Sequence, residues 1–303
     1  MISIITAVHN QIEHNKLYLE SLQKYTFHPY EIIVVDNHSA DGSGEFLKKN
    51  GCQVIRNEKN FCYPESMNQG IVRAKYDILC FLNNDVWVGV HWDKYLIEAM
   101  DKHHLDIVSP MGIERRATLS ETARERKKWN RIGRLKHLRS SENQLKDLIT
   151  EMYGNWESFC ADFTRRNENT IIEGIVGNCV LAKRSAMEKI GNWDERLQSA
   201  DWDICLNALK RFRDHKDVRP IKTVGGAYIH HFLQATLKNN PEPFACTHPR
   251  LGLYEKWKKE EVISLWPFPQ EVLDAPSWIW SPLKYLKYKY KKFFLLYEWG
   301  DSY

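Results

Sequence analysis

The chain has 303 residues, of which 43% are hydrophobic, and its formal net charge is only +4. This balance excludes an intrinsically disordered protein and allows one large domain or two closely packed halves. No stretch reaches the roughly 18 uncharged apolar residues that a membrane-spanning helix needs. The N-terminus lacks the pattern of a signal peptide, and the seven cysteines form no CxxC pair. We therefore expect a cytoplasmic protein with reduced thiols, whose membrane contacts are peripheral.

Short apolar runs alternate with helical patterns up to residue 111. We expect strands at residues 2–8, 31–36, 52–56, 77–82 and 105–110, and helices at 13–24, 41–49, 65–75 and 92–102. Continuous apolar strands that alternate with helices predict an α/β fold with a mainly parallel central sheet flanked by helices. Ligands of such sheets bind outside the carboxyl ends of the strands, which is where Asn10, Asp36 and Asp85 fall.

The segment 78–88 is the most informative part of the chain. An apolar run ends in Asn83, Asn84 and Asp85, and then an apolar run resumes. A buried strand with this pattern delivers a carboxylate to the edge of a sheet. One carboxylate there can hold a divalent cation, and the cation can hold a diphosphate. Together with a second acidic pair, Asp201 and Asp203, this pattern predicts sugar-nucleotide chemistry.

The pattern breaks between residues 112 and 170. Lysine and arginine far outnumber acidic residues between 115 and 139, which predicts an exposed basic helical insertion or lid. Its basic face either binds an anionic acceptor, binds nucleic acid or is simply solvated. We favour the acceptor over nucleic acid because no nucleic-acid-binding motif accompanies the basic residues.

Near the C-terminus, residues 282–297 alternate lysine with large aromatic and aliphatic side chains. This pattern predicts a basic amphipathic helix, within a helical tail that covers residues 251–303. Such a helix either lies on a membrane surface or docks on a protein body, its own or that of a second copy.

Several motifs occur in an order that resembles a known family. Segments 6–10, 34–43 and 82–86 are similar to the nucleotide-binding half of the GT-A glycosyltransferases of family 2. Segment 177–197 resembles the acceptor-side block of that family, and segment 201–206 resembles the acidic motif that follows it. The resemblance runs over residues 2–235, and the basic insertion and the tail lie outside it. It implies a GT-A (nucleotide-diphospho-sugar transferase) fold.

The resemblance also implies a division of the chain. Residues 1–111 would form the nucleotide-sugar-binding half of the GT-A domain, and residues 171–250 the acceptor-binding half. The basic helical insertion, 112–170, would separate the two halves, and the helical tail, 251–303, would follow them.

For the donor site, the resemblance implies that Asp36 accepts a hydrogen bond from N3–H of uracil or thymine. A turn or capping role is the alternative for this carboxylate. Ala7 and His9 would line the pocket for the base and ribose. The donor-binding residues implied in this way are Thr6, Ala7, His9, Asn10, Asp36, Asn37, Ser39, Asn60, Asn68, Asn83 and Asn84.

Asp85 is the expected ligand of Mn²⁺ or Mg²⁺, both of which favour oxygen ligands. The family often has an aspartate where this chain has Asn83, a departure that weakens metal affinity. A histidine after the apolar segment 225–229 resembles the second metal ligand of the family. We prefer His230 for this role, with His231 as the alternative.

Asp201 is the candidate catalytic base, because inverting transfer needs a carboxylate beside the acceptor hydroxyl. Asp203 is the rival, with helix capping as its other role. The family motif commonly reads Glu-Asp, whereas this chain has Ala200 before Asp201. The residues expected around the acceptor are Trp193, Asp194, Glu195 and Trp202.

These observations predict an inverting, metal-dependent glycosyltransferase. It would move a hexosyl-type sugar from a UDP- or dTDP-sugar to a glycan or lipid-linked acceptor in the synthesis of cell-surface polysaccharide or lipopolysaccharide. We expect it at the inner face of the cytoplasmic membrane, with no nucleic-acid partner. One alternative is a non-catalytic nucleotide- or glycan-binding GT-A module. A nucleotidyltransferase is disfavoured, because residues 9–11 do not form a glycine-rich basic loop.

Overall fold

The computed structural model describes residues 1–133, 136–197, 199–233 and 244–265. The tail helix expected at 282–297 lies outside these residues. The first half of the chain contains β1 (Ile2–Val8), α1 (Ile12–Tyr25), β2 (Tyr30–Asn37), α2 (Ser43–Lys49), β3 (Gln53–Asn57), α3 (Tyr63–Arg73), β4 (Ile78–Leu82), β5 (Val86–Val88), α4 (Trp92–Lys102) and β6 (Ile107–Met111). Every expected element up to residue 111 is present, and the short strand β5 is an addition.

The second half begins with helices. It contains α5 (Leu119–Ile132), the 3₁₀ turn η1 (His137–Arg139), α6 (Glu142–Tyr153), α7 (Trp156–Asn167), β7 (Ile171–Glu173), β8 (Cys179–Lys183), α8 (Arg184–Ile190), α9 (Ala200–His215), β9 (Lys222–His231), α11 (Leu253–Lys256) and α12 (Lys259–Leu265). The apolar stretch that begins at residue 171 contains two strands, β7 and β8. Gly174 adopts a φ of 105° between them, a conformation that favours glycine.

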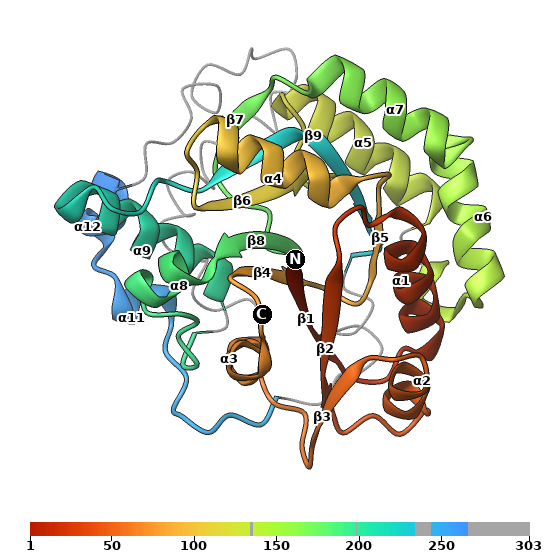
Figure 1. The fold of residues 1–303 in the computed structure, drawn as a ribbon, viewed down its shortest axis with the longest axis horizontal. Coiled ribbons are helices and arrows are strands. Elements are labelled where there is room, and N and C mark those ends of the chain that lie inside the picture. The colour runs from red at the N-terminus through yellow and green to blue at the C-terminus, as the bar shows by residue number, and fades with distance from the viewer. Residues whose placement is uncertain (134–135, 198, 234–243, 266–303) are drawn as a thin grey trace, which may run out of the picture.

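The described strands form one sheet in the order β3-β2-β1-β4-β8-β6-β9-β5, with β7 paired to β9 (Figure 1). Strands β1 to β4 are parallel, as expected; Ile5 lies opposite Ile33 on β2 and Phe81 on β4. The other half is mixed, because β8 runs antiparallel to both β4 and β6. The α/β fold with a central sheet flanked by helices is confirmed, and its parallel pairing is concentrated in the first half.

Both faces of the sheet are buried, because successive side chains of a strand point to opposite faces. On β1, Ile4 packs into a core shared with α1, α2 and α4, while Ile5 packs against α3, α8 and α9. Continuous apolar strands are what a sheet covered on both faces requires. This arrangement leaves the strand ends as the place where polar side chains gather.

The insertion is helical, but it is not a detached lid. Trp129 on α5 and Phe163 on α7 are fully buried in the same core as β1 and α1. Helix α5 begins at a capping box, in which Thr118 and Glu121 satisfy each other's backbone groups. Its outer face carries the exposed basic side chains. The expectation of an exposed insertion therefore holds for the outer sides of these helices, whose inner sides belong to the core.

Within the part of the chain that the structure describes, no helix is long and apolar enough to cross a membrane.

Candidate active site

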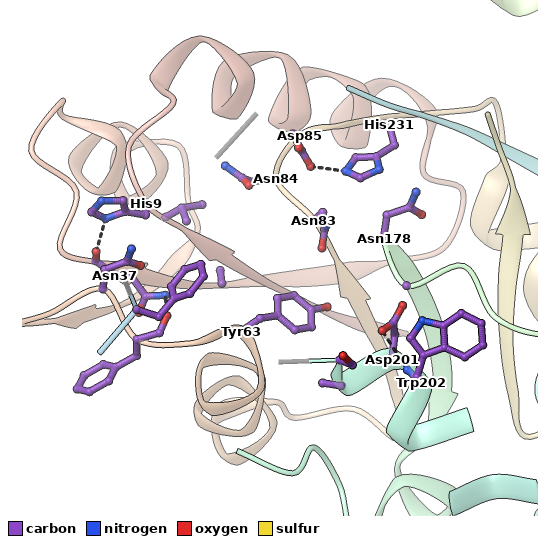
Figure 2. Close-up of a pocket in the computed structure, with 18 of the residues that line it drawn as sticks. His9, Asn37, Tyr63, Asn83, Asn84, Asp85, Asn178, Asp201, Trp202 and His231 are labelled. Carbon is purple, nitrogen blue, oxygen red and sulfur yellow. Dashed lines mark hydrogen bonds and ion pairs between the residues drawn. The ribbon is translucent and has the colours of Figure 1, made fainter. Parts of the chain in front are cut away.

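A cavity of about 330 Å³ opens at the carboxyl ends of β1, β2 and β4 (Figure 2). Its walls come from elements far apart in the sequence. They are Ala7, Val8, His9, Asn37, Asn60, Phe61, Tyr63, Asn83, Asn84, Asp85, Glu114, Gly177, Asn178, Ser199, Ala200, Asp201, Trp202, His231 and Phe244. Most of the residues predicted for the donor, the metal and the base are therefore brought together.

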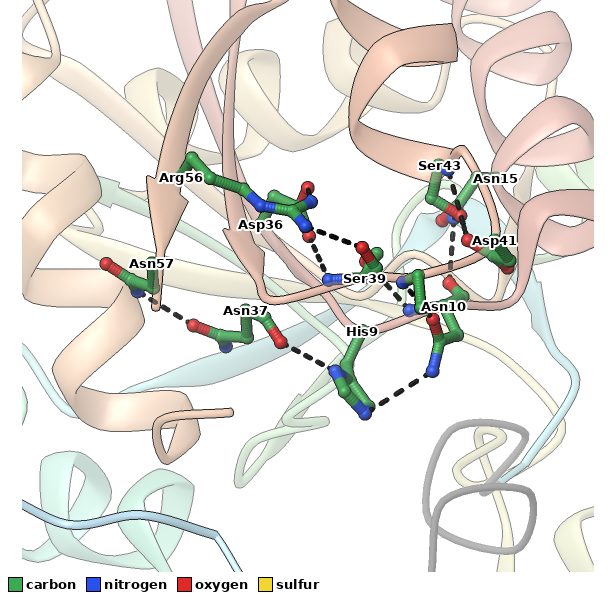
Figure 3. A network of polar contacts seen from close by, with 11 residues as sticks. His9, Asn10, Asn15, Asp36, Asn37, Ser39, Asp41, Ser43, Arg56 and Asn57 are labelled. Carbon is green, nitrogen blue, oxygen red and sulfur yellow. Dashed lines mark hydrogen bonds and ion pairs between the residues drawn. The ribbon is translucent and has the colours of Figure 1, made fainter. Parts of the chain in front are cut away.

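At one end of the cavity, a polar network fixes the loops that follow β1 and β2 (Figure 3). The Nδ1–H of His9 donates to the backbone carbonyl of Asn37 at 2.6 Å. The side-chain amide of Asn37 donates to Ser66 at 2.9 Å, and its oxygen accepts from Asn57 at 2.8 Å. The backbone N–H of Asn10 donates to Ser39 at 2.9 Å. Hydrogen bonds among residues of β2, β3 and α3 thus hold these elements together at the end of the cavity where we expect the nucleotide.

Asp36 is held by partners within the protein. Its carboxylate is fully buried, pairs with Arg56 and accepts the backbone N–H of Ser39 at 2.9 Å. A side chain at Gly44 would come within 2.1 Å of Asp36 Oδ2, so this packing requires glycine. Asp36 does not line the cavity, whereas its neighbour Asn37 does. The alternative role, a carboxylate that holds a turn, fits the structure better than a contact with the base.

Other expected donor residues fall into two groups. Asn60, Asn83 and Asn84 line the cavity, and the amide of Asn84 also donates to Asn15 at 2.7 Å. Thr6, Asn10, Ser39 and Asn68 do not line it. The side chain of Asn68, on α3, lies outside this cavity, and its amide donates to the carbonyl of Trp193 and to Glu195.

Asp85 and His231 both line the cavity and are in contact, with Asp85 Oδ1 and His231 Nε2 3.0 Å apart. His230 is fully buried on the other side of β9, where its Nδ1 contacts the hydroxyl of Tyr153 at 2.8 Å and its ring lies 4.5 Å from that of Trp129. The geometry therefore favours the alternative, His231, over His230 as a metal ligand. Adjacent residues of a strand point to opposite faces, so only His231 reaches Asp85.

The spacing of this pair suits a divalent cation. Two adjacent ligands of an octahedral ion, each about 2.1 Å from it, lie about 3.0 Å apart. Asp85 and His231 meet this condition with one oxygen and one nitrogen. Among the described residues, no group of three or more His, Cys, Asp and Glu is arranged to hold a metal. The described side chains would thus supply two ligands and leave the remaining positions to phosphate oxygens and water.

The charge of His231 is set by its two neighbours. Burial alone would lower the pKa of its imidazole, but Asp85 and Glu114 outweigh this effect and raise the pKa well above its usual value. Glu114 Oε2 accepts a hydrogen bond from His231 Nδ1 at 3.0 Å. The imidazole is thus held between two carboxylates, so its protonated form is favoured when no cation is bound, and a cation ligated by Nε2 would replace the proton there.

Asp201 lies in the first turn of α9 and lines the cavity (Figure 2). Burial raises the pKa of its carboxyl group, and the backbone N–H of Trp202 donates to it at 2.9 Å. A side chain at Gly177 would come within 2.4 Å of Asp201 Oδ2, so glycine is needed beside this carboxylate. A buried carboxylate with a raised pKa is suited to take up a proton.

Asp203 occupies a different environment from Asp201. It is fully buried, accepts from Trp257 Nε1 at 2.7 Å and pairs with Lys256 at 2.8 Å. It also accepts from Asn207 at 3.0 Å and does not line the cavity. Asp203, the alternative base, therefore joins α9 to Lys256 at the end of α11 and to Trp257, the residue after it.

Three of the four expected acceptor residues lie elsewhere. Trp193 is buried, with its ring edge-on to those of Tyr63 and Phe81. Trp193, Asp194 and Glu195 line a second cavity, of about 420 Å³. Only Trp202 borders the first cavity with Asp201. Trp193, Asp194 and Glu195 thus lie outside the first cavity, and Trp193 packs in the core between α3 and the sheet.

Sequence reasoning missed several cavity residues. Glu114 is the third residue after β6, as Asp85 is the third residue after β4. It was assigned to the basic insertion, so this signal was not used. Tyr63, Asn178 and Phe244 carried no comparable signal, because each reaches the cavity only through tertiary packing.

Comparison with known proteins fits this site. Residues 3–191 match the family model described as "Glycosyl transferase family 2". The chain belongs to glycosyl transferase family 2. The matched range includes His9, Asn37, Asp85 and Glu114, and it ends before α9 and β9.

Two curated relatives of this family 2 chain are glycosyltransferases by name. The "Putative glycosyltransferase EpsH" of Bacillus subtilis (strain 168) is 30% identical over 91 residues, 29% of this chain and 26% of the relative. "Glycosyltransferase GlyG" of Streptococcus pneumoniae serotype 4 (strain ATCC BAA-334 / TIGR4) is 26% identical over 113 residues, 36% of this chain and 38% of the relative. The match thus spans well under half the length of either relative.

Two solved structures show detectable likeness to this chain, and one of them is named as a mannosyltransferase. S. aureus TarS 1-349 in complex with UDP-GlcNAc has 15% identity and a TM-score of 0.47, with 90% of this chain and 66% of that chain covered. The mannosyltransferase PcManGT from Pyrobaculum calidifontis, in complex with GDP-Man and Mn²⁺, has 12% identity and a TM-score of 0.48, with 98% and 81% covered. Likeness at this level does not extend to donor, acceptor or metal.

Proposed function

We propose that this family 2 chain is an inverting, metal-dependent glycosyltransferase of the hexosyl type that uses a UDP- or dTDP-sugar. The observation that carries the proposal is the arrangement of one cavity. The pair Asp85–His231 and the buried carboxylate of Asp201 belong to the same cavity, and His9 and Asn37 mark its other end. This cavity therefore has residues suited to bind the nucleoside and the diphosphate and a carboxylate suited to act as the catalytic base.

Each part of the reaction has a group suited to it. Asp201 would take the proton of the acceptor hydroxyl as its oxygen attacks C1 of the donor sugar. The bond from C1 to the diphosphate breaks on the opposite face, so the configuration at C1 is inverted. Asp85 and His231 would hold Mn²⁺ or Mg²⁺ with the diphosphate, and the ion would offset the negative charge of the leaving group. His9, Asn37 and Asn60 would surround the nucleoside.

The acceptor that we propose is an anionic glycan or lipid-linked glycan of cell-surface polysaccharide or lipopolysaccharide synthesis. Arg124, Lys127 and Arg131 are exposed on one side of α5, at spacings that align side chains on a helix. Such a basic face favours phosphorylated partners. The basic sequence 282–297 fits a peripheral contact with an anionic lipid surface at the inner face of the membrane.

A donor screen tests the proposal. The protein is incubated with Mn²⁺ or Mg²⁺, a panel of UDP-, dTDP- and GDP-sugars and phosphorylated glycan acceptors, and release of nucleoside diphosphate is followed. We expect metal-dependent release from one donor, abolished in Asp85→Ala and Asp201→Ala, and a product of inverted anomeric configuration by NMR. Nucleotide binding without turnover on any acceptor would instead favour a non-catalytic module. Release that persists with excess chelator would remove the metal from the proposal.

A further inference from the structure

Glu114 stands out among the cavity residues because it contacts both sides of the site. It follows β6 and lines the cavity that Asp85 and His231 share. Its Oε2 accepts hydrogen bonds from two donors, His231 Nδ1 at 3.0 Å and the side-chain amide of Asn178. One oxygen thus joins the end of β9 to the residue that precedes β8.

The contact with His231 determines how the imidazole is presented. A histidine ring can turn by half a rotation about its Cβ–Cγ bond, which exchanges Nδ1 with Cδ2 and Nε2 with Cε1. An acceptor at Nδ1 fixes one orientation and keeps the proton on Nδ1. The opposite nitrogen, Nε2, then faces Asp85 Oδ1 at 3.0 Å. The ring is thus held at Nδ1 by Glu114, and its Nε2 is directed toward Asp85.

The contact with Asn178 extends the same support to the loop of Asp85. The backbone carbonyl of Asn178 accepts from the backbone N–H of Asn83 at 2.9 Å. Figure 2 shows Asn178 beside the pair formed by Asp85 and His231. Glu114 is therefore linked to both members of the pair, directly to His231 and through Asn178 to the turn that carries Asp85.

We propose that Glu114 is a positioning residue, which holds His231 by Nδ1 so that Nε2 and Asp85 together form the cation site beside the donor diphosphate. The inference rests on the proposed function, since it assumes that this pair binds the metal. Outer carboxylates that orient a histidine ligand typically affect metal affinity by about 10- to 100-fold. Glu114 itself would not contact the ion or the reacting atoms.

Two substitutions separate positioning from charge. In Glu114→Gln, the amide oxygen can still accept from both His231 and Asn178, whereas Glu114→Ala removes both hydrogen bonds. We expect Glu114→Ala to weaken Mn²⁺ binding, measured by electron paramagnetic resonance with UDP present, by about 10- to 100-fold. Glu114→Gln should retain most of the affinity. Glu121→Gln is the matched control, because it removes one charge from the capping box of α5 and preserves the cap.

A second readout needs no metal and no turnover. The His231 Nδ1 proton is buried and hydrogen-bonded, so it should give a downfield ring N–H resonance in the metal-free protein. The Nε2 proton, which faces Asp85, can give a second such resonance. His231→Gln identifies both by their loss, and the resonance that persists in Asp85→Ala is that of the Nδ1 proton. We expect it to persist in Glu114→Gln and Glu121→Gln and to disappear in Glu114→Ala, while thermal unfolding confirms that each variant is folded.

The outcomes separate this inference from the proposed function. Unchanged resonance and unchanged Mn²⁺ affinity in Glu114→Ala would overturn the positioning role. Equal losses in Glu114→Gln and Glu114→Ala would also overturn it, because charge and not orientation would then matter. If the wild-type protein binds no Mn²⁺, the metal part of the proposed function fails, and the ring resonance still decides whether Glu114 holds His231.

Discussion

At the scale of single residues, the two carboxylates of α9 show how close neighbours acquire different chemistry. Asp201 borders the cavity, and burial raises its pKa. Asp203 is two positions further along, paired with Lys256 and bonded to Trp257. Residues two apart on a helix are separated by about 200° around its axis, so they face nearly opposite sides. The proposed base role of Asp201 and the structural pairing of Asp203 are consistent with this separation.

We predict that Asp201→Asn lowers kcat by about 10²- to 10⁴-fold, the usual contribution of a positioned base. The variant should still bind the nucleoside diphosphate, because the nucleotide end of the cavity is unchanged. Asp203→Asn should instead lower the free energy of unfolding by about 1–3 kcal/mol, because it disrupts a buried charged hydrogen-bond network. Kinetics and denaturant unfolding on both variants separate the two roles.

The pH profile of the wild-type protein gives an independent reading of the same group. A base acts only when deprotonated, so kcat/KM should fall as the pH drops through the pKa of Asp201. Because burial raises that pKa, the acidic limb should lie at higher pH than an exposed aspartate would give.

A full loss of kcat in Asp203→Asn with activity retained in Asp201→Asn would reverse the assignment.

At the scale of elements, β9 and α5 are packed against each other by one aromatic cluster. The ring of Trp129 on α5 lies 4.5 Å from that of His230 and 5.8 Å from that of Phe232. His230 precedes His231, which faces the cavity. The insertion therefore supports the strand end that carries a proposed metal ligand, from the side opposite the cavity.

We predict that Trp129→Ala lowers the free energy of unfolding by about 3–5 kcal/mol, the range for truncation of a large buried aromatic residue. Arg131→Ala, on the exposed side of the same helix, should change it by no more than about 0.5 kcal/mol. Urea unfolding monitored by circular dichroism measures both. A wild-type midpoint in Trp129→Ala would show that α5 does not share the cooperative core.

At the scale of the whole molecule, the cavity lies where the parallel half of the sheet meets the mixed half. Its walls include His9 from the end of β1 and Asp201 from α9, so a ligand that fills it contacts both halves. A ligand that binds only the folded state stabilises the protein by an amount that depends on its concentration and affinity. Nucleotide binding should therefore stabilise the protein as a unit.

We predict that UDP or dTDP with Mn²⁺ raises the unfolding temperature in a concentration-dependent way. At about 100 times Kd the stabilisation should reach about 2.7 kcal/mol. Differential scanning fluorimetry with and without Mn²⁺ measures it, and Asp85→Ala should lose the metal-dependent part while keeping its own baseline stability. No stabilisation by any nucleotide would argue against a nucleotide site in this cavity.

The sequence by itself determined the alternation of strands and helices in the first half of the chain. Apolar runs of strand length, separated by helical patterns, specify a sheet buried on both faces. It also determined that Asn83, Asn84 and Asp85 lie at a strand end, because polar residues there interrupt an otherwise apolar run. These features depend on local periodicity, which neighbouring residues carry in full.

Only the tertiary structure decided which member of each neighbouring pair faces the cavity. Asn37 lines it and Asp36 does not, Asp201 lines it and Asp203 does not, and His231 lines it and His230 does not. In each case the two residues point to nearly opposite sides of one strand or helix, and the side that borders the cavity depends on distant elements. Glu114 is a separate case: its place after a strand end is visible in the sequence, but its partner His231 lies on a strand more than a hundred residues later.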